Sequence, residues 1–437
     1  MKLADIIETF ISGDWGEEKV AEDTPNSVFC IRGADIVPIT NHCFNGIPQR
    51  FVCDKTIENK TLKAGDLIIE KSGGSPTQST GRIIYVSEDM IKAKGNVVCS
   101  NFCTAFRVKA GWNPLYVYYF WQNVYNHGAF FNFEGKTSGI KNLQLDNALS
   151  AIDIEYLPLE KQNRIVASLA SIDEKIKVNR QINDNLEAMA KQLYDYWFVQ
   201  FDFPNEEGKP YKSSGGAMVW NEKLKREIPQ GWNNGVLSDV ANIMMGQSPD
   251  GSSYNEDGEG IIFYQGSTDF GLRFPDIRQY TTLPSRYANK GDILMSVRAP
   301  VGALNIANND CCIGRGLSAL SSKIGSMTHL YYLMNDFRLK FEGMNSAGTT
   351  FGSITKDELF SLPVVIPTKS VISEFEQVCE QIFDKQMIIG EEINALTKQR
   401  DELLPLLMNG QASVNYHLLS RTMPDKGVAN SLKIVEA

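Results

Sequence analysis

The sequence predicts an α+β protein in which two similar globular domains, related by a pseudo-two-fold axis, are joined by two long antiparallel helices that form a coiled coil. Three observations predict this fold class. The two halves of the 437-residue chain repeat the same landmark motifs in the same order. A long amphipathic helical segment follows each set of motifs, and short β-rich segments bounded by Gly, Ser and Pro fill the globular parts. A duplicated chain presents two similar surfaces, which suits a partner that is itself repeated or two-fold, such as duplex DNA.

The repeated landmarks are short motifs rather than long stretches of identity. Their spacing in the two halves is similar, and the offset between the copies falls from 233 residues at Gly33 and Gly266 to 210 in the helices. The matched segments are Ile31–Asp35 with Tyr264–Asp269, Lys63–Ile68 with Asn289–Leu294, Tyr118-Tyr119 with Tyr331-Tyr332, and Lys136–Ile140 with Thr349–Ile354. Their common order predicts that the two domains share one topology.

The first globular domain is expected over residues 1–157 and the second over residues 225–367. In the first, strands are expected over 66–70, 82–86 and 97–100, and an aromatic-rich helix over 115–124. In the second, strands are expected over 292–296 and 362–367. Residues 201–224 are polar and rich in Gly, Ser, Glu and Lys, which predicts a linker, and residues 411–437 have no periodicity, which predicts a loose tail.

The two helical regions are expected over residues 158–200 and 368–410. Apolar residues follow a strict 4-3 spacing in both, which places them on one seam of a supercoiled helix. The seam positions are Ile165, Leu169, Ile172, Ile176, Asn179, Asn183, Leu186, Ala190, Leu193 and Trp197 in the first helix, and Phe375, Cys379, Ile382, Gln386, Ile389, Ile393, Leu396, Arg400, Leu403 and Leu407 in the second.

A long exposed helix with one apolar stripe needs a partner in water. If a two-fold axis relates the halves, the two helices run antiparallel, with Asn179 and Asn183 near Ile393 and Ile389. Two alternatives stay open at this point: a coiled coil with an unrelated protein, and two separate seams between copies of this chain.

Composition indicates a soluble cytoplasmic chain. The first residues turn charged at Lys2 and Asp5, which argues against a signal peptide, and no run of 18 apolar residues predicts a membrane span. The eight cysteines are expected to be buried thiols, with a zinc site at Cys99 and Cys103 or at His42 as the alternative. The net charge of −9 means that a DNA-binding surface must be local.

Motifs of enzymes are weak in this chain. Residues 113–116 (Asn-Pro-Leu-Tyr) are similar to the Asn-Pro-Pro-Tyr motif of amino methyltransferases, but the second Pro and an upstream glycine-rich loop are missing, so a structural turn is expected there. Gly314-Arg315-Gly316 does not make a dinucleotide fingerprint, and the sequence contains no phosphate-binding Gly-x-x-x-x-Gly-Lys motif. We therefore expect a chain that is not itself an enzyme and binds no cofactor or metal.

Two segments resemble the conserved regions of one family. Residues 157–165 (Leu-Pro-Leu-Glu-Lys-Gln-Asn-Arg-Ile), continuing to Trp197-Phe198, resemble the first conserved region of type I restriction–modification specificity subunits. Residues 228–232 (Ile-Pro-Gln-Gly-Trp) resemble the signature that opens their second target-recognition domain. Two segments depart from the family pattern: residues 366–370 differ from the first copy, and residues 13–16 replace the opening signature of the first domain.

The resemblance implies a non-catalytic subunit that selects the DNA sequence for a larger enzyme. Each target-recognition domain would read one half of an asymmetric bipartite site in double-stranded DNA. The paired helices would fix the spacer and dock two methyltransferase subunits, which use S-adenosylmethionine to methylate adenine. Motor–nuclease subunits that use ATP and Mg²⁺ would complete the complex, and no membrane is involved.

Candidate DNA-binding residues lie in loops where Gly, Ser and Thr alternate with cations, because such loops offer donors to phosphates and base edges. They are Arg32, Lys71, Ser72, Thr77, Arg82, Lys136, Thr137 and Lys141 in the first half, and Gln265, Ser267, Arg298, Arg315, Thr349, Thr350 and Lys356 in the second. For each of them an ordinary polar turn is the alternative. At the level of the whole chain the alternatives are a nuclease or methyltransferase that acts alone, and a coiled-coil scaffold for other proteins.

Overall fold

The computed structural model describes residues 1–73, 78–137, 140–346, 352–413 and 435–436. The chain divides into two compact units, Met1–Val178 with Ala395–Ala437 (unit 1) and Asn179–Asn394 (unit 2). Each unit contains one globular domain together with a stretch of both long helices, α6 (Leu159–Tyr194) and α10 (Lys369–Met408). Among the described residues, no helix is both long enough and apolar enough to cross a membrane.

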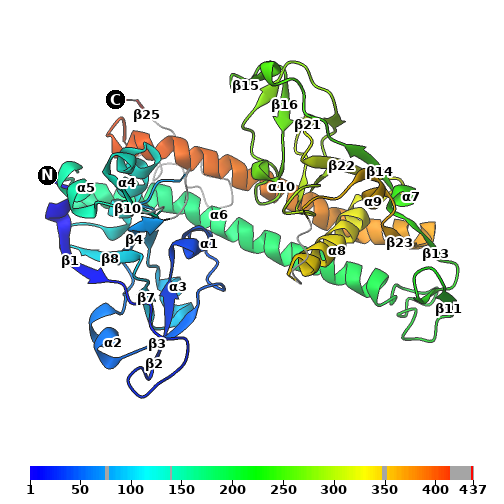
Figure 1. Cartoon of the computed structure of the whole chain (residues 1–437), viewed down its shortest axis with the longest axis horizontal. Coiled ribbons are helices and arrows are strands. Elements are labelled where there is room, and N and C mark those ends of the chain that lie inside the picture. Colours follow the sequence, from blue (N-terminus) through cyan, green and yellow to red (C-terminus); the bar gives the residue numbers. More distant parts are fainter. Residues whose placement is uncertain (74–77, 138–139, 347–351, 414–434, 437) are drawn as a thin grey trace, which may run out of the picture. The chain divides into compact units, whose positions relative to one another are not determined.

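The globular domain of unit 1 is built on a four-stranded antiparallel sheet in the order β1-β8-β4-β6, of which Figure 1 labels β1, β8 and β4. A second sheet has the order β3-β2-β7, in which β2 and β7 run parallel. The bounds of these strands are β1 Ile7–Ser12, β2 Asn26–Ile31, β3 Gln49–Val52, β4 Leu67–Glu70, β6 Ile83–Tyr85, β7 Val97–Cys99 and β8 Cys103–Val108. A third small sheet joins β5 (Ser72–Gly73), β10 (Ile140–Leu143) and β9 (Glu134–Thr137).

Among the described residues, five α-helices complete this domain: α1 Ile36–Thr40, α2 Asp54–Lys60, α3 Glu88–Lys94, α4 Pro114–Asn126 and α5 Leu145–Ala151. Asn113 caps α4, since its side chain accepts hydrogen bonds from the backbone N–H groups of Leu115 (2.9 Å) and Tyr116 (3.3 Å), and Pro114 takes the first helical position. The methyltransferase-like motif at 113–116, where a structural turn was expected, has a structural role as the N-terminus of α4.

Unit 2 repeats this plan with a four-stranded sheet in the order β14-β22-β19-β20 and a five-stranded sheet in the order β15-β17-β16-β21-β18. The bounds are β14 Ala241–Met245, β15 Tyr254–Asn255, β16 Ile261–Tyr264, β17 Tyr280–Thr281, β18 Tyr287–Ala288, β19 Ile293–Ser296, β20 Leu304–Ile306, β21 Cys311–Ile313 and β22 Leu317–Ser322. The remaining elements are β11 Met218–Asn221, β12 Arg226–Pro229, β13 Asn233–Val236, α7 Leu237–Val240, α8 Met327–Ser346, α9 Lys356–Phe360 and β23 Pro363–Ile366.

The two domains share strand order and register, which confirms the predicted duplication. Ile68 of β4 lies opposite Ala105, and Leu294 of β19 lies opposite Ala319. The turn before each central strand is closed in the same way, by an aspartate that accepts a backbone hydrogen bond of 2.8 Å: Lys63 N–H to Asp66, and Asn289 N–H to Asp292. The expected strands at 66–70, 82–86, 97–100, 292–296 and 362–367 and the helix at 115–124 are confirmed.

Helices α6 and α10 run antiparallel, as the fold class predicted. In unit 2, Asn179 Nδ2 donates to Glu392 (2.9 Å) and Gln386 Nε2 donates to Glu187 (2.8 Å), so the partner number falls as the α6 number rises. In unit 1, Arg400 forms an ion pair with Asp173 at 3.2 Å. All twenty seam positions predicted from the 4-3 spacing are buried or half-buried.

The polar stretch at 201–224, expected to be a linker, is folded. Phe201 and Phe203 are buried, and the ring of Phe203 stacks on Trp232 with centroids 5.1 Å apart. These aromatic residues stand among polar neighbours in the sequence, which hides their apolar role. They join the core of unit 2, next to the π-helical turn Asp195–Val199 that follows α6. Of the expected tail at 411–437, only residues 411–413 and 435–436 are described, and the two-residue strands Ala412–Ser413 and Val435–Glu436 pair with each other.

Candidate nucleic-acid interface

The matched motifs around Gly33 and Gly266 form related turns, and the turn in unit 2 is one residue longer: the 3₁₀ turn Gly33–Asp35 begins directly after Arg32, whereas Ser267–Asp269 begins after Gly266. Each follows the strand that runs parallel to its neighbour, β2 in unit 1 and β16 in unit 2. In each turn an aspartate accepts a backbone hydrogen bond of 2.8 Å from the first residue: Arg32 N–H to Asp35, and Gln265 N–H to Asp269. Arg32 and Gln265 each directly follow the last residue of their strand, Ile31 or Tyr264, whose carbonyl oxygen accepts a backbone hydrogen bond of 2.8 Å from Ser100 or Gly314. Their backbone positions correspond in strand register, and their role in DNA binding stays a prediction.

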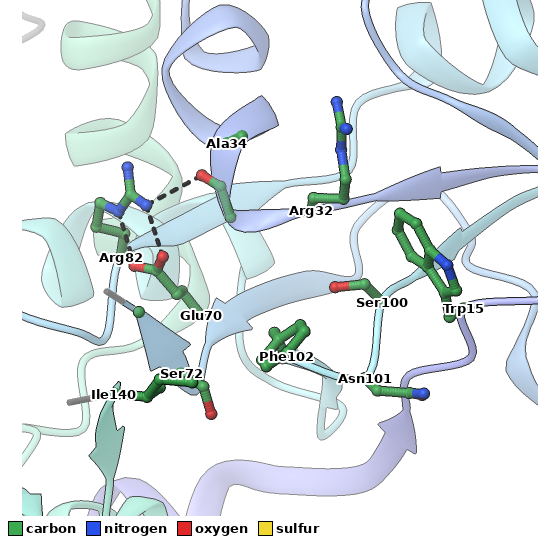
Figure 2. A pocket seen from close by; sticks show the side chains of 12 residues that line it. Trp15, Arg32, Ala34, Glu70, Ser72, Arg82, Ser100, Asn101, Phe102 and Ile140 are labelled. Carbon is green, nitrogen blue, oxygen red and sulfur yellow. Dashed lines mark hydrogen bonds and ion pairs between the residues drawn. The ribbon is translucent and has the colours of Figure 1, made fainter. Parts of the chain in front are cut away.

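In unit 1 this turn is braced by a buried ion pair. Arg82 donates two hydrogen bonds to Glu70, at 2.7 and 2.6 Å, and a third to the carbonyl of Gly33 at 3.0 Å (Figure 2). These bonds to Glu70 raise the pKa of Arg82. Glu70 is buried and accepts two hydrogen bonds from the guanidinium of Arg82. Arg82 therefore stabilises the turn through the carbonyl of Gly33 and has few donors left for DNA.

A pocket of about 700 Å³ opens beside this brace. Figure 2 shows Glu70 and Arg82 on one side of the pocket, Trp15 on the other, and Phe102 and Asn101 between them. Its lining combines apolar side chains (Trp15, Ala34, Phe102 and Ile140) with polar or charged ones (Arg32, Glu70, Ser72, Arg82, Ser100 and Asn101), and Phe102 is more than half exposed. Such a pocket offers stacking and methyl contacts together with hydrogen-bonding groups.

In unit 2 the corresponding loops also come together. The N–H of Gly316 donates to Gln265 O (3.2 Å), and the N–H of Val297 donates to Gly316 O (2.9 Å). Arg298 in turn forms a β-bridge with Ser353, which joins the loop after β19 to the loop before α9. The same neighbourhood exists in unit 1, where the strand of Ser72–Gly73 pairs with β10.

The cations of the two units differ in their partners. In unit 1, Arg32 pairs with Asp35 at 2.8 Å, and Lys141 pairs with the buried Glu134 at 3.4 Å. In unit 2, Arg298 and Arg315 are exposed, and neither pairs with a carboxylate among the described residues. Unit 2 therefore presents unneutralised guanidinium groups beside its turn, whereas unit 1 presents a pocket with neutralised cations.

The other candidates lie around these sites or outside them. Lys71 lines a separate recess with Gln144 and Asn147, and Ser72 donates a hydrogen bond to Asn142 at 2.5 Å. Lys356 is exposed, with its ammonium 5.3 Å from the ring of Phe360. The remaining positions are Lys136 and Thr137, whose backbone lies in β9, Ser267, which begins the 3₁₀ turn after Gln265, and Thr77, Thr349 and Thr350, which lie outside the described residues.

A glycine pair that the sequence comparison did not single out shapes both sites. A Cβ atom on Gly13 would lie 1.9 Å from the carbonyl oxygen of Ser100, and one on Gly246 would lie 2.1 Å from that of Gly314. Each glycine is followed by the same backbone hydrogen bond, Asp14 N–H to Cys99 O and Gln247 N–H to Ile313 O. The spacing of Gly13 and Gly246 is 233 residues, the same as that of Gly33 and Gly266, so this offset was the signal that would have found them.

Six of the eight cysteines are buried as expected, including the candidate zinc ligands Cys99 and Cys103, but Cys53 is only half-buried and Cys43, beside His42, is exposed. Burial raises the pKa of Cys103 to about 11 and of Cys30 to about 12, so both stay protonated at neutral pH. The described residues contain no group of three or more His, Cys, Asp or Glu side chains that is arranged to hold a metal ion.

Comparison with known proteins gives a consistent result over both units. The family model of the type I restriction modification DNA specificity domain matches residues 52–188 and 229–404. The specificity subunit assigned to the type I restriction enzyme MjaX of Methanocaldococcus jannaschii is 34% identical over 275 residues, covering 61% of this chain and 60% of that protein. The MjaIX specificity subunit of the same organism is 26% identical over 285 residues, covering 61% and 62%. The chain thus matches about three fifths of the length of these two relatives.

The fold is also similar to that of a solved structure. The crystal structure of the type I restriction–modification S subunit from M. genitalium superimposes with a TM-score of 0.52 at 14% identity, covering 93% of this chain and 95% of that one. This likeness concerns the fold, in which two domains are joined by long helices. Because the family model matches well over half of the chain and does so once in each half, the chain belongs to the family of type I restriction–modification DNA specificity proteins.

Proposed function

We propose that this chain is the non-catalytic specificity subunit of a type I restriction–modification complex, in which each globular domain reads one half of an asymmetric bipartite site in double-stranded DNA. The observation that carries the proposal is the duplicated site. In both units an Asp-capped turn lies near two loops and near a glycine, Gly13 or Gly246, that closely approaches a carbonyl oxygen. The side chains at the corresponding positions of the two units differ. A similar backbone arrangement that carries different side chains is suited to reading two different half-sites.

The two domains are expected to use different chemistry. In the second domain, Arg298, Arg315 and Gln265 are exposed around one turn and suit phosphates and purine edges. In the first, the pocket lined by Trp15 and Phe102 suits apolar contact with a base, including a thymine methyl group, and Asn101 at its edge supplies a donor and an acceptor.

The helices are proposed to set the spacer and to dock two methyltransferase subunits, which bring S-adenosylmethionine. Motor–nuclease subunits that use ATP and Mg²⁺ would join them, and the chain itself would bind none of these cofactors. Exposed apolar side chains support the docking role: in unit 2, Ile182 and Met189 of α6 and Ile388 of α10 are 39%, 53% and 63% exposed.

Methylation mapping of DNA from cells that co-express this chain with its methyltransferase tests the reading role. An N6-methyladenine motif with two half-sites is expected, and it should disappear when the chain is deleted. Arg298→Ala together with Arg315→Ala is expected to weaken discrimination in one half-site only. A complex that forms but yields no chain-dependent motif would contradict the proposal.

Copurification of the methyltransferase subunit tests the docking role. Met189→Glu and Ile388→Glu are expected to reduce its recovery, because each places a charge at an apolar contact. Asn185→Glu, which adds the same charge at an exposed polar position of α6, is the matched control and should leave recovery unchanged.

A further inference from the structure

A buried arginine ties the second globular domain to both long helices. Arg273, in the loop before β17, is only 7% exposed, and its guanidinium lies 3.3 Å from Gln386 Oε1 of α10 and 3.5 Å from Glu187 of α6. The guanidinium lies over the rings of Phe383 (5.0 Å) and Tyr331 (5.5 Å). One side chain of the domain therefore contacts both helices at once within unit 2.

The next residue, Phe274, packs against α10 at Gly390, where the helix has no side chain. Phe274 is 3% exposed, and a Cβ atom placed on Gly390 would lie 2.6 Å from Phe274 Cε2. Glycine inside a helix lowers helix stability relative to alanine. Here it allows the ring to reach the helix backbone, so Gly390 and Phe274 form a steric match.

The loop that carries Arg273 and Phe274 is connected to the candidate reading turn. The N–H of Ile306 donates to Arg273 O (2.9 Å), and the N–H of Asp276 donates to Asp269 O (2.7 Å). Asp269 is the residue that closes the turn beginning at Gln265. A movement of Arg273 on the helices would therefore move that turn.

We propose that Arg273 and Phe274 are positioning residues that lock the second domain in one orientation on the helix pair and thereby fix the spacer length that the complex accepts. This inference rests on the proposed DNA-reading function. The guanidinium of Arg273 is buried, whereas the Glu187 side chain is 36% exposed. Contacts of a buried guanidinium add little net stability compared with an apolar replacement, but their direction favours one geometry over its neighbours. The steric match at Gly390 acts in the same direction, since it permits one placement of the ring.

The contacts of Arg273 and Phe274 with the two helices are called the latch below, and the chain offers a matched control for them. Lys290, from the same domain, forms an ion pair of 3.2 Å with Glu391 of the same helix, but both side chains are more than half exposed. An exposed pair of this kind constrains orientation weakly. Lys290→Met should therefore leave spacer selection unchanged.

The test measures methylation of targets that keep both half-sites and differ only in spacer length, using the complex with its methyltransferase subunits. For Arg273→Met and for Gly390→Ala, the preference for the native spacer over one changed by a single base pair is expected to fall about tenfold. The half-site sequences should stay the same. Phe274→Leu added to Gly390→Ala gives the new methyl group room and is expected to restore the preference.

Hydrogen–deuterium exchange on the DNA-free chain separates the latch from the reading function. Arg273→Met is expected to speed exchange at the amides of Ile306 and Asp276, whereas Lys290→Met should not. Unchanged exchange would overturn the latch whether or not a methylation motif is found. Faster exchange with an unchanged spacer preference would overturn its role in spacing, and a wild-type complex that methylates no motif would refute the reading function instead.

Discussion

The hydroxyl group of Tyr119 donates a hydrogen bond of 2.5 Å to the carboxylate of Asp173. Tyr119 is buried in α4 of the first domain and Asp173 belongs to α6, where it also pairs with Arg400 of α10 at 3.2 Å. Burial, followed by the charge of Asp173, raises the pKa of Tyr119, so the phenol is protonated and acts as a donor at neutral pH. The first domain is thus anchored to both helices through a helix carboxylate, whereas the second is anchored through its own arginine.

Removing the phenol hydroxyl should weaken this anchor. Tyr119→Phe leaves Asp173 with Arg400 as its partner, and we expect a loss of about 1–2 kcal/mol in the free energy of unfolding, measured by urea titration. Tyr116→Phe is the matched control, because Tyr116 is equally buried in the same helix and its hydroxyl has no partner among the described residues. Equal losses in the two variants would refute the anchoring role.

His329 should make the protein acid-sensitive. Burial lowers the pKa of His329 from 6.5 to about 3, and its Nδ1 has no partner among the described residues. The folded state therefore binds fewer protons than the unfolded state between these values, so stability is complete above pH 6.5 and is lost as the pH falls towards 3. At pH 5 the loss from this residue is about 2 kcal/mol.

The measurement for His329 compares urea unfolding at pH 7.5 and pH 5. His329→Phe keeps the ring contact with Phe198, whose centroid lies 4.5 Å away, and removes the titrating group. The variant should lose about 2 kcal/mol less than the wild type over this interval. Parallel losses would mean that His329 is protonated in the folded protein.

Gly13 and Gly246, which closely approach carbonyl oxygens, should tolerate no side chain. Gly13→Ala and Gly246→Ala each place a methyl group within about 2 Å of a carbonyl oxygen, so the backbone must shift, and we expect a loss of about 3 kcal/mol in each case. Gly46→Ala and Gly251→Ala are the controls, because a Cβ atom at either position meets no atom within 4 Å. Thermal unfolding of the four variants distinguishes close backbone approach from a general effect of replacing glycine.

Arg82, Arg298 and Arg315 are all candidate DNA-binding residues by sequence, but they should have different roles. Arg82→Met leaves Glu70 buried without its partner and should cost about 3–5 kcal/mol of stability. Arg298→Ala and Arg315→Ala should leave stability unchanged and weaken DNA binding, each reducing the slope of log K against log salt by about 1. Unfolding titrations and binding at several salt concentrations separate the two roles, and a normal salt slope in both exposed variants would argue against phosphate contacts there.

Much of the fold could be predicted because it depends on periodicity and on repetition. The 4-3 spacing identified the helix seams, and the paired Gly-Asp turns located the central strands of both sheets. The partner of each cation could not be predicted in this way. Arg82 was a candidate DNA ligand, but it meets Glu70 only because β4 and β6 pair antiparallel, and Arg273 meets Glu187 and Gln386 across more than 80 residues of sequence. Such contacts depend on tertiary structure, which local patterns do not encode.

The different anchors have a consequence for the evolution of such genes by recombination. Positions offset by 210 residues are equivalent in the two helices, so a copy of the second domain inserted at the first position would place Arg273 against Asp173, Ile176 and Thr397 in place of Phe383, Gln386 and Glu187. The inserted domain would exchange the ring of Phe383 and the amide of Gln386 for the carboxylate of Asp173, which pairs with Arg400, and for the apolar side chain of Ile176. Exchange of whole domains between like positions therefore keeps these contacts, whereas a move between unlike positions replaces them with a different set.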